Sequence, residues 1–166
     1  MGTDLGDFPG GQGISVAYDV NRYSVVVGFG TDGTGCCGYQ AFRWEPGKGL
    51  LNLGALPGSY DDNRAYGIND LGQIVGSSNN KAFIWTAALG MRDLNSLVTN
   101  LPAGWTLQLA RDVNEAGQIV GTAITADGQT KRAFVLTPVP EPSLFALVAA
   151  VGAFSVALSR RGPGAP

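Results

Sequence analysis

The sequence predicts an all-β body of β-propeller-like repeats, arranged as a partial or open ring, followed by one hydrophobic helix at the C-terminus. Three observations support this class. One sequence segment recurs three times within residues 1–137. The composition, with 25 glycines in 166 residues and only 14% charged residues, suits many short strands joined by tight turns. Residues 143–159 carry no charge, as is typical of a membrane-spanning segment.

The recurring segment is Ala-Tyr-Gly-Ile-Asn-Asp-Leu-Gly-Gln-Ile-Val-Gly at 65–76, and altered copies occupy 17–28 and 110–121. Each copy precedes a second signature, which is Ala-Phe-x-Trp at 41–44 and 82–85 and Ala-Phe-Val-Leu at 133–136. The period is marked by Asn21, Asn69 and Asn114, which are 48 and 45 residues apart. A period of this length with strand-like content is typical of propeller blades or a β-solenoid.

Each repeat is predicted to form four short strands, over residues 14–53, 64–94 and 107–136. The first strand ends at the asparagine, and a four-residue turn follows in which Gly72 takes the left-handed conformation of a type I turn with a bulge. The second strand covers 73–77, the third carries the aromatic signature, and the fourth covers 50–53 or 91–94. The two aromatic residues of the signature lie two apart and share a face. We therefore expect a core between repeats, rather than a ligand-binding surface, from Phe42, Trp44, Phe83, Trp85 and Phe134.

The acidic residues of the turns, Asp70 and Glu115, allow two interpretations. They could bind calcium or take part in catalysis, or they could serve only the turn itself. The first repeat has Arg22 at the corresponding position and no glycine two residues later. Turn chemistry is therefore the favoured interpretation.

The two ends of the repeat region complement one another. Pro138 follows the third strand of the last repeat, so this repeat lacks a fourth strand. Residues 4–10 (Asp-Leu-Gly-Asp-Phe-Pro-Gly) match residues 53–58 (Leu-Gly-Ala-Leu-Pro-Gly), which we assign to the end of the fourth strand of the first repeat. We expect residues 3–6 to pair as an orphan strand beside 132–136. A longer precursor would account both for having fewer repeats than the usual four to eight blades and for the absence of an export signal at 1–6.

The repeated pattern resembles the extracellular HAF repeat, which occurs in bacterial surface proteins. The resemblance covers about residues 14–136, and the first copy is degenerate. It implies a propeller-like body and no particular reaction.

The C-terminal region divides into a linker, a hydrophobic segment and a basic end. Pro138, Pro140 and Pro142 disfavour helix and keep residues 138–142 extended. Residues 143–159 are predicted to form a transmembrane helix, which at about 16 residues would cover roughly 24 Å. Arg160 and Arg161 then act as a membrane stop, which places residues 160–166 in the cytoplasm. A buried helix of the folded domain is the alternative, although no polar face is present.

This combination of Pro140, Glu141 and Pro142 with a hydrophobic segment and a basic pair resembles the PEP-CTERM sorting signal. The resemblance implies recognition of the tripeptide by exosortase, a membrane protease-transpeptidase. It also implies removal of the anchor and delivery to the cell surface or extracellular matrix of a Gram-negative bacterium that makes exopolysaccharide. The alternative is a proline-rich linker before a permanent tail anchor.

The composition argues against several classes of function. The chain has no histidine, the commonest general base and transition-metal ligand, and no metal or other cofactor is expected. Its net charge of −2, with no basic stripe, argues against nucleic acid as a partner. Cys36 and Cys37 are the only cysteines and are adjacent, so they could form only a strained vicinal disulfide or pair with another chain. A local loop feature is the favoured interpretation over metal or redox chemistry.

The leading functional hypothesis is a non-enzymatic surface or matrix protein delivered by its sorting tail, with exopolysaccharide as a further partner. The first alternative is a carbohydrate-binding module that stacks sugars on exposed aromatic rings, the candidates being Tyr18, Tyr39, Tyr60, Tyr66 and Trp105. The second is a glycan-active enzyme that uses Asp61 and Asp62 as paired carboxylates. Adjacent acidic residues in a strand point to opposite sides, which makes the enzyme the weakest of the three.

Overall fold

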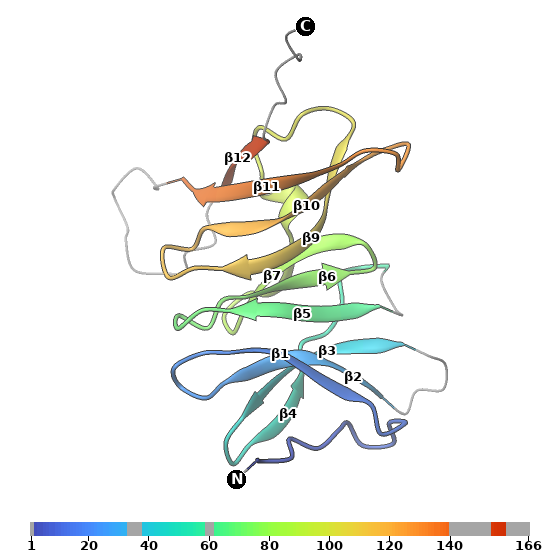
Figure 1. Ribbon diagram of the computed structural model, residues 1–166, viewed down its shortest axis with the longest axis vertical. Helices are drawn as coiled ribbons and strands as arrows, with labels where there is room; N and C mark the ends of the chain where they lie inside the picture. The colour runs from blue at the N-terminus through green and yellow to red at the C-terminus, as the bar shows by residue number, and fades with distance from the viewer. Residues whose placement is uncertain (1, 33–37, 59–61, 140–153, 159–166) are drawn as a thin grey trace, which may run out of the picture.

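The protein consists of three four-stranded antiparallel sheets stacked along its long axis (Figure 1). This computed structural model describes residues 2–32, 38–58, 62–139 and 154–158. The first sheet contains β1 (Ser15–Val20), β2 (Val26–Thr31), β3 (Tyr39–Glu45) and β4 (Gly49–Asn52). The second contains β5 (Asn63–Ile68), β6 (Ile74–Ser78), β7 (Lys81–Thr86) and β8 (Gly90–Asp93). The third contains β9 (Trp105–Val113), β10 (Ile119–Thr125), β11 (Lys131–Pro138) and β12 (Phe154–Leu158).

The all-β prediction is confirmed, and each predicted repeat forms one sheet with its strands in sequence order. The single helix among the described residues is the short 3-10 helix η1 (Leu94–Ser96), which follows β8. The third sheet differs from the others because its fourth strand comes from the C-terminal segment.

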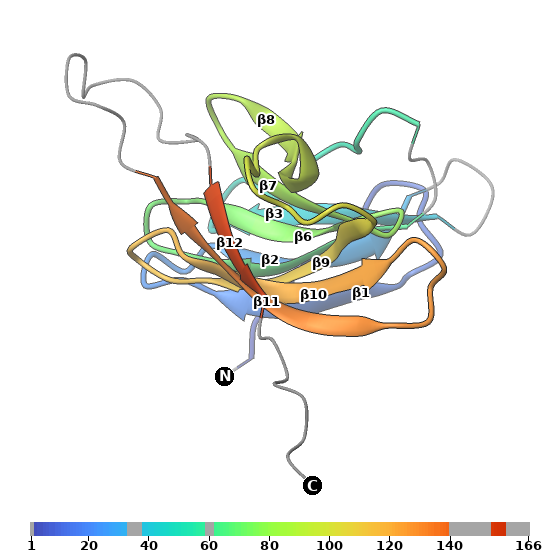
Figure 2. The same ribbon diagram turned by 90° about the horizontal axis from the view of Figure 1, so that it is seen from above.

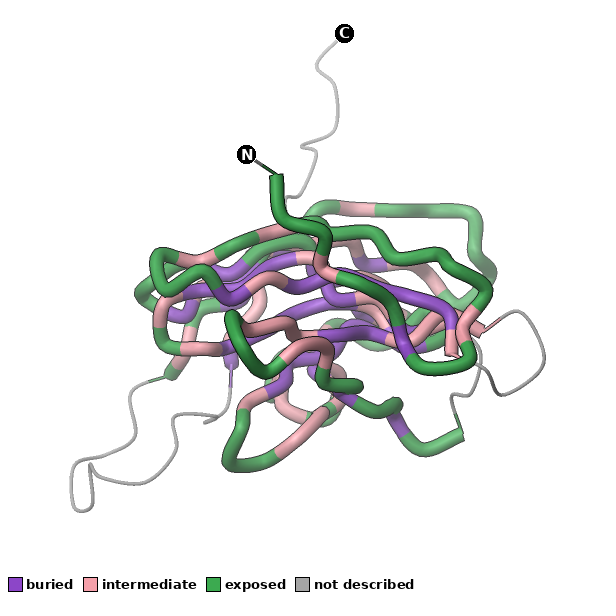
Figure 3. Tube along the Cα trace, turned by 90° about the horizontal axis from the view of Figure 1, so that it is seen from below, coloured by how far each residue is buried: buried purple, intermediate pink, exposed green. Residues whose placement is uncertain are grey.

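The sheets pack face to face, and seen from above they lie over one another (Figure 2). Strand β5 contacts β1, β2 and β3 of the first sheet, and β9 contacts β5, β6 and β7 of the second. Two hydrophobic clusters fill the two spaces between sheets. Buried positions therefore run through the interior of the stack, while the turns at its margins are exposed (Figure 3).

Three of the repeated aromatic residues belong to these clusters, as expected: Phe83 and Trp85 lie between the first and second sheets, and Phe134 lies between the second and third. The expectation of a core between repeats is wrong for Phe42 and Trp44, which belong to neither cluster. Phe42, Phe83 and Phe134 are buried, and so is Trp85, while Trp44 in the first sheet is half-buried. Each phenylalanine packs beside the last glycine of the repeated segment. The two residues lie opposite each other on neighbouring antiparallel strands. The two signatures of the repeat are thus two parts of one packing unit.

The glycine of this unit has a steric cause that the sequence analysis did not identify. A Cβ added at Gly76 would lie 2.0 Å from the carbonyl oxygen of Arg64 and 2.6 Å from Cζ of Phe83. The corresponding distances at Gly121 are 2.0 Å and 2.6 Å, and at Gly28 they are 1.9 Å and 2.9 Å. Only glycine leaves room for both the neighbouring strand and the ring.

The prediction for the C-terminal segment is wrong where the structure describes it. Phe154–Leu158, expected within the helix at 143–159, forms strand β12, which pairs antiparallel with β11 from Phe134↔Leu158 to Pro138↔Phe154. Phe154 and Val156 alternate with Ser155, a period that suits a strand, and Phe154 is buried in the cluster between the second and third sheets. The rest of that predicted helix lies outside the described residues. Within the described part of the chain, no helix has the length and apolar character needed to cross a membrane.

The third sheet has a fourth strand, β12, so the predictions that this repeat lacks one and that residues 3–6 supply it are both wrong. Residues 2–14 form no strand. Phe8 is buried against Phe42, with ring centroids 6.5 Å apart in an edge-on arrangement. The physical reason is the turn chemistry of this segment, in which Gly6 and Gly10 have φ angles of 76° and 77°.

The same loop shape occurs after the first sheet. Gly54 and Gly58 have φ angles of 80° and 79°, so residues 53–58 follow the course of residues 5–10. Leu56 is buried between the first and second sheets, as Phe8 is buried on the outer face of the first sheet. The sequence match between the two segments therefore reflects a linker, not a strand.

Candidate functional site

The first strand of each sheet contains a β-bulge at the same repeat position. In β1 the pairing passes from Ala17↔Gly28 directly to Asp19↔Val27, which leaves Tyr18 without a partner residue. The same shift leaves Tyr66 unpaired in β5 and Arg111 unpaired in β9. Bulges redirect a side chain and often occur at functional sites, so this position is the first candidate in the fold.

These three side chains stack across the sheets. The rings of Tyr18 and Tyr66 have centroids 5.0 Å apart, and the Arg111 guanidinium carbon lies 5.0 Å from the centre of the Tyr66 ring. We call Tyr18, Tyr66 and Arg111 the bulge column. Tyr18 is 45% exposed, and Arg111 is also exposed, so the column forms a surface.

A second group of rings supports the column from the first sheet. Phe29 lies 5.7 Å from Tyr18 and 4.6 Å from Tyr39, measured between ring centroids. The guanidinium carbon of Arg64 lies 4.9 Å from the ring centre of Phe29 and 4.5 Å from that of Tyr39. Aromatic and cation–π contacts of this kind fix the rings without blocking the exposed side of the column.

The charges around the column favour a neutral tyrosine and charged arginines. Burial raises the pKa of the Tyr66 hydroxyl, which Arg64 opposes only in part, so the phenol remains a hydrogen-bond donor at neutral pH. Burial by itself lowers the pKa of Arg64, but the Asp62 carboxylate outweighs this effect and the pKa is raised. The Arg64 Nε donates to Asp62 Oδ1 at 2.7 Å.

The turns between the first and second strands form a second polar feature. In the second sheet Asn69 Oδ1 accepts from the Gln73 N–H at 3.0 Å, and the Gly72 N–H donates to the Asn69 carbonyl at 3.1 Å. Gly72 has a φ angle of 76°, as predicted for this turn. Asn21 and Asn114 make the equivalent hydrogen bonds in the turns of the other two sheets.

The same asparagines also connect neighbouring sheets. Asn21 Nδ2 donates to the Asn69 carbonyl at 3.2 Å, and Asn69 Nδ2 donates to the Asn114 carbonyl at 3.0 Å. We call this series of contacts the turn ladder. It runs in one direction, from each sheet to the next along the chain.

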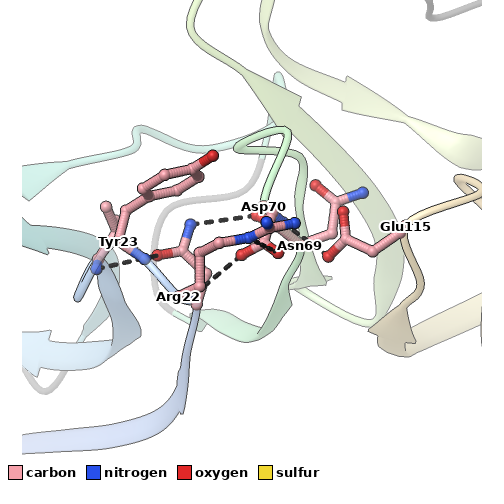
Figure 4. Close-up of polar contacts among 7 residues, drawn as sticks. Arg22, Tyr23, Asn69, Asp70 and Glu115 are labelled. Atoms are coloured by element: carbon pink, nitrogen blue, oxygen red, sulfur yellow. Dashed lines mark hydrogen bonds and ion pairs between the residues drawn. The ribbon is translucent and has the colours of Figure 1, made fainter.

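The acidic turn residues take part in the ladder (Figure 4). Asp70 Oδ1 accepts from the Arg22 N–H at 2.9 Å, and Glu115 Oε1 accepts from the Asp70 N–H at 2.9 Å. Arg22 and Asp70 also form an ion pair. The backbone N–H and then the side chain of Arg22 hold the pKa of Asp70 below its usual range.

Asp70 and Glu115 occur in the two repeats that follow another described sheet. Each acid accepts a hydrogen bond from the preceding sheet, and the structure places no sheet before the first among the described residues. The sequence analysis missed the connection. Its signal was the recurrence of an acid after the asparagine in the second and third copies alone.

The other predicted site residues are dispersed. Asp62 is paired with Arg64, and its predicted partner Asp61, like Tyr60, lies outside the described residues. Trp105 begins β9 and lies 5.4 Å from the Arg132 guanidinium carbon, separate from the bulge column. Among the residues that the structure describes, no three His, Cys, Asp or Glu side chains come together as a metal site would require. The remaining predicted residues lie outside the described chain: Cys36, Cys37, Pro140, Glu141, Pro142, Arg160 and Arg161.

Comparisons of the chain with protein-family models, with curated proteins and with solved structures gave no significant match.

Proposed function

We propose that this chain is a non-enzymatic surface protein whose repeat body is exported and sorted by its C-terminal segment. The observation that carries this proposal is the order of three features in the last 27 residues, namely Pro140-Glu141-Pro142, the uncharged run at 143–159 and Arg160-Arg161. An exosortase-like membrane protease is the proposed partner. The precursor is anchored in the membrane with its C-terminus in the cytoplasm, and the mature body reaches the cell surface or the extracellular matrix.

Strand β12 connects this proposal to the fold. Residues 154–158 cannot be a strand of the third sheet and part of a membrane helix at the same time. Membrane insertion of the precursor would leave β11 without β12, and cleavage near Pro140 would make that state permanent. The third sheet of the mature protein would then have three strands.

The sorting proposal is tested by replacing Pro140-Glu141-Pro142 with three alanines in a host that has exosortase. The variant should stay in the membrane fraction with its tail uncleaved, because the protease no longer recognises it. A matched variant in which glutamates replace Arg160 and Arg161 should keep the tripeptide but lose retention or orientation, because the cytoplasmic charge bias is gone. Normal release of the triple-alanine variant would contradict the proposal.

For the body we propose an arc of propeller-like blades. The first strands of the three sheets contact one another in series, β1 with β5 and β5 with β9, as the innermost strands of adjacent blades do. The turn ladder supports this arrangement, because it repeats the same contact at each step. Together these contacts make a rigid support for surface display.

A second function, carbohydrate binding, is favoured by the bulge column. An exposed tyrosine ring such as Tyr18 offers a flat apolar surface to the face of a sugar ring, and Arg111 and the Tyr66 hydroxyl supply donors for its hydroxyl groups. The ligand class would be the exopolysaccharide of the same cell. This activity would deepen the surface role without replacing it.

Binding can be measured on a glycan array and with purified exopolysaccharide. Tyr18→Ala should lose most of the binding, whereas Tyr23→Ala should keep it, because Tyr23 is 62% exposed but lies outside the column. Trp105→Ala tests the separate site at the start of β9. Equal binding by Tyr18→Ala and the wild type would exclude the column as the site.

A further inference from the structure

The first and third sheets each have one face on the outside of the stack. The equivalent faces of the other sheets are buried at the inner interfaces. We propose that a second copy of this chain packs head to tail on the first, with the third sheet of one copy against the first sheet of the other. The proposal rests on repeat equivalence and on polar contacts, and it does not depend on the sorting tail or on sugar binding.

The front face of a sheet is the face turned toward the preceding sheet. In the second sheet it carries the cross-strand row Ile68–Ile74–Trp85, and in the third the row Val113–Ile119–Leu136. All six side chains are buried.

The same register in the first sheet gives the row Val20–Val26–Trp44. Here Val20 is 57% exposed, and Val26 and Trp44 are only partly covered. Ala17 is exposed as well, although its counterparts Ala65 and Ala110 are fully buried. The exposed front face of the first sheet is therefore apolar. It has the same residue pattern and strand register as the front faces of the second and third sheets, which each pack on another sheet.

The rear face shows the complementary pattern in the third sheet. In the second sheet Val75, Ala82 and Ile84 are buried against the third. Their counterparts in the third sheet are Val120, Ala133 and Val135. Val120 is 44% exposed, Ala133 is exposed and Val135 is partly covered.

The N-terminal segment does not obstruct the front face. Phe8 covers Phe42 at one end of this face, much as Leu56 is buried between the first and second sheets. The interface between the first and second sheets thus already accommodates a linker residue, Leu56. The row from Val20 to Trp44 remains available beside it.

The turn ladder gives the contact its direction. Asn114 is the last asparagine of the ladder, and among the described residues its Nδ2 donates only to Gln118 Oε1, at 2.8 Å within its own turn. At the inner interfaces the equivalent Nδ2 atoms of Asn21 and Asn69 also donate to the backbone carbonyl of the asparagine in the next sheet. In a head-to-tail contact the next asparagine carbonyl would be that of Asn21 in the second copy.

The charged turn residues are already engaged within the chain: Arg22 pairs with Asp70, and Glu115 accepts from the Asp70 N–H. The direction of the contact therefore follows from the asparagines. Because each apolar face finds its complement on the other end of the same chain, a second copy is the occupant that we assign.

The test is the mass of the full chain in solution, kept in a mild detergent and measured by sedimentation at several concentrations. Wild type should form dimers or larger species. Val20→Arg blocks the front face and Val120→Arg blocks the rear face, so each variant alone should be monomeric. Leu71→Arg is the matched control: Leu71 is 72% exposed but lies in a turn, and this variant should assemble like wild type.

An equimolar mixture of the two blocked variants gives the sharpest result. Each retains one intact face, and the two intact faces are complementary, so the mixture should form a pair of two chains and nothing larger. A monomeric wild type, a Val120→Arg variant that assembles alone, or a mixture that stays monomeric would overturn the proposal. Circular dichroism checks that each variant is folded, and Ala133→Arg replaces Val120→Arg if that variant unfolds.

Discussion

Replacing Gly76 with alanine should destabilise the protein far more than its small change in volume suggests. The added Cβ would lie 2.0 Å from the Arg64 carbonyl oxygen and 2.6 Å from Cζ of the buried Phe83 ring. Relief requires both that β5 move away from β6 and that the ring shift from its site. Overpacking of a core costs about 1–3 kcal/mol, and two rigid neighbours place this site near the upper end, at about 3 kcal/mol. For a chain of this size the midpoint of thermal unfolding should fall by roughly 6–12 °C.

The measurement is thermal unfolding followed by far-UV circular dichroism, with Gly72→Ala as the matched control. Gly72 has a φ angle of 76° and nothing within 4 Å of an added Cβ, so its substitution adds only backbone strain, about 1 kcal/mol. In a Phe83→Ala background the Gly76→Ala substitution should cost less, since one of its two obstacles is gone. If Gly76→Ala unfolds no earlier than Gly72→Ala, the steric account of the repeat is wrong.

Three further predictions concern the turns and the last strand. Ser24 has a φ angle of 60° where the other repeats have glycine, so Ser24→Gly should raise the unfolding midpoint by an amount equivalent to about 1 kcal/mol, and a lower midpoint would contradict the turn equivalence. The folded-state pKa of Asp70 is lowered, so its contribution to stability is present above the unfolded pKa of about 3.9 and is lost as the pH falls through the folded pKa. Asp70→Asn should therefore lose less stability than wild type between pH 5 and pH 2, and parallel unfolding curves would argue against the ladder contact. Phe154 is buried, so Phe154→Ala should cost about 3–5 kcal/mol in the full chain, whereas Ser155→Ala should have little effect; equal midpoints for the two variants would remove β12 from the core.

The repeat body could be predicted from the sequence because its determinants are local. The asparagine and glycine of each turn, the short strands and the Ala-Phe signature all lie within one repeat. These features predicted the three sheets and the burial of Phe83 and Phe134 between them, whereas Phe42 is covered by Phe8 of the N-terminal segment.

The C-terminal strand could not be predicted because its determinants are not local. A run of Phe, Val, Ala and Leu is compatible with a buried strand as well as with a membrane helix, and periodicity alone does not distinguish them. What places β12 is the open edge of β11 and the backbone contacts between Phe154 and residues 97–99, which are far away in the sequence.

The bulge column was partly visible in the sequence. Tyr18 and Tyr66 were both proposed as sugar-stacking residues, but Arg111, at the equivalent position, was not. The bulge that unites the three arises from strand register, which depends on pairing with the second strand of each sheet. The recurring residue after the repeated alanine was the signal that could have identified it.

The functional account depends most on the fate of the C-terminal segment. Its most direct test is the intact mass of the protein recovered from the surface or the medium of an exosortase-containing host. Sorting predicts a mature chain that ends near Pro142 and lacks residues 143–166. A surface-exposed protein that still carries those residues would contradict the account, because the segment would then be a permanent part of the molecule.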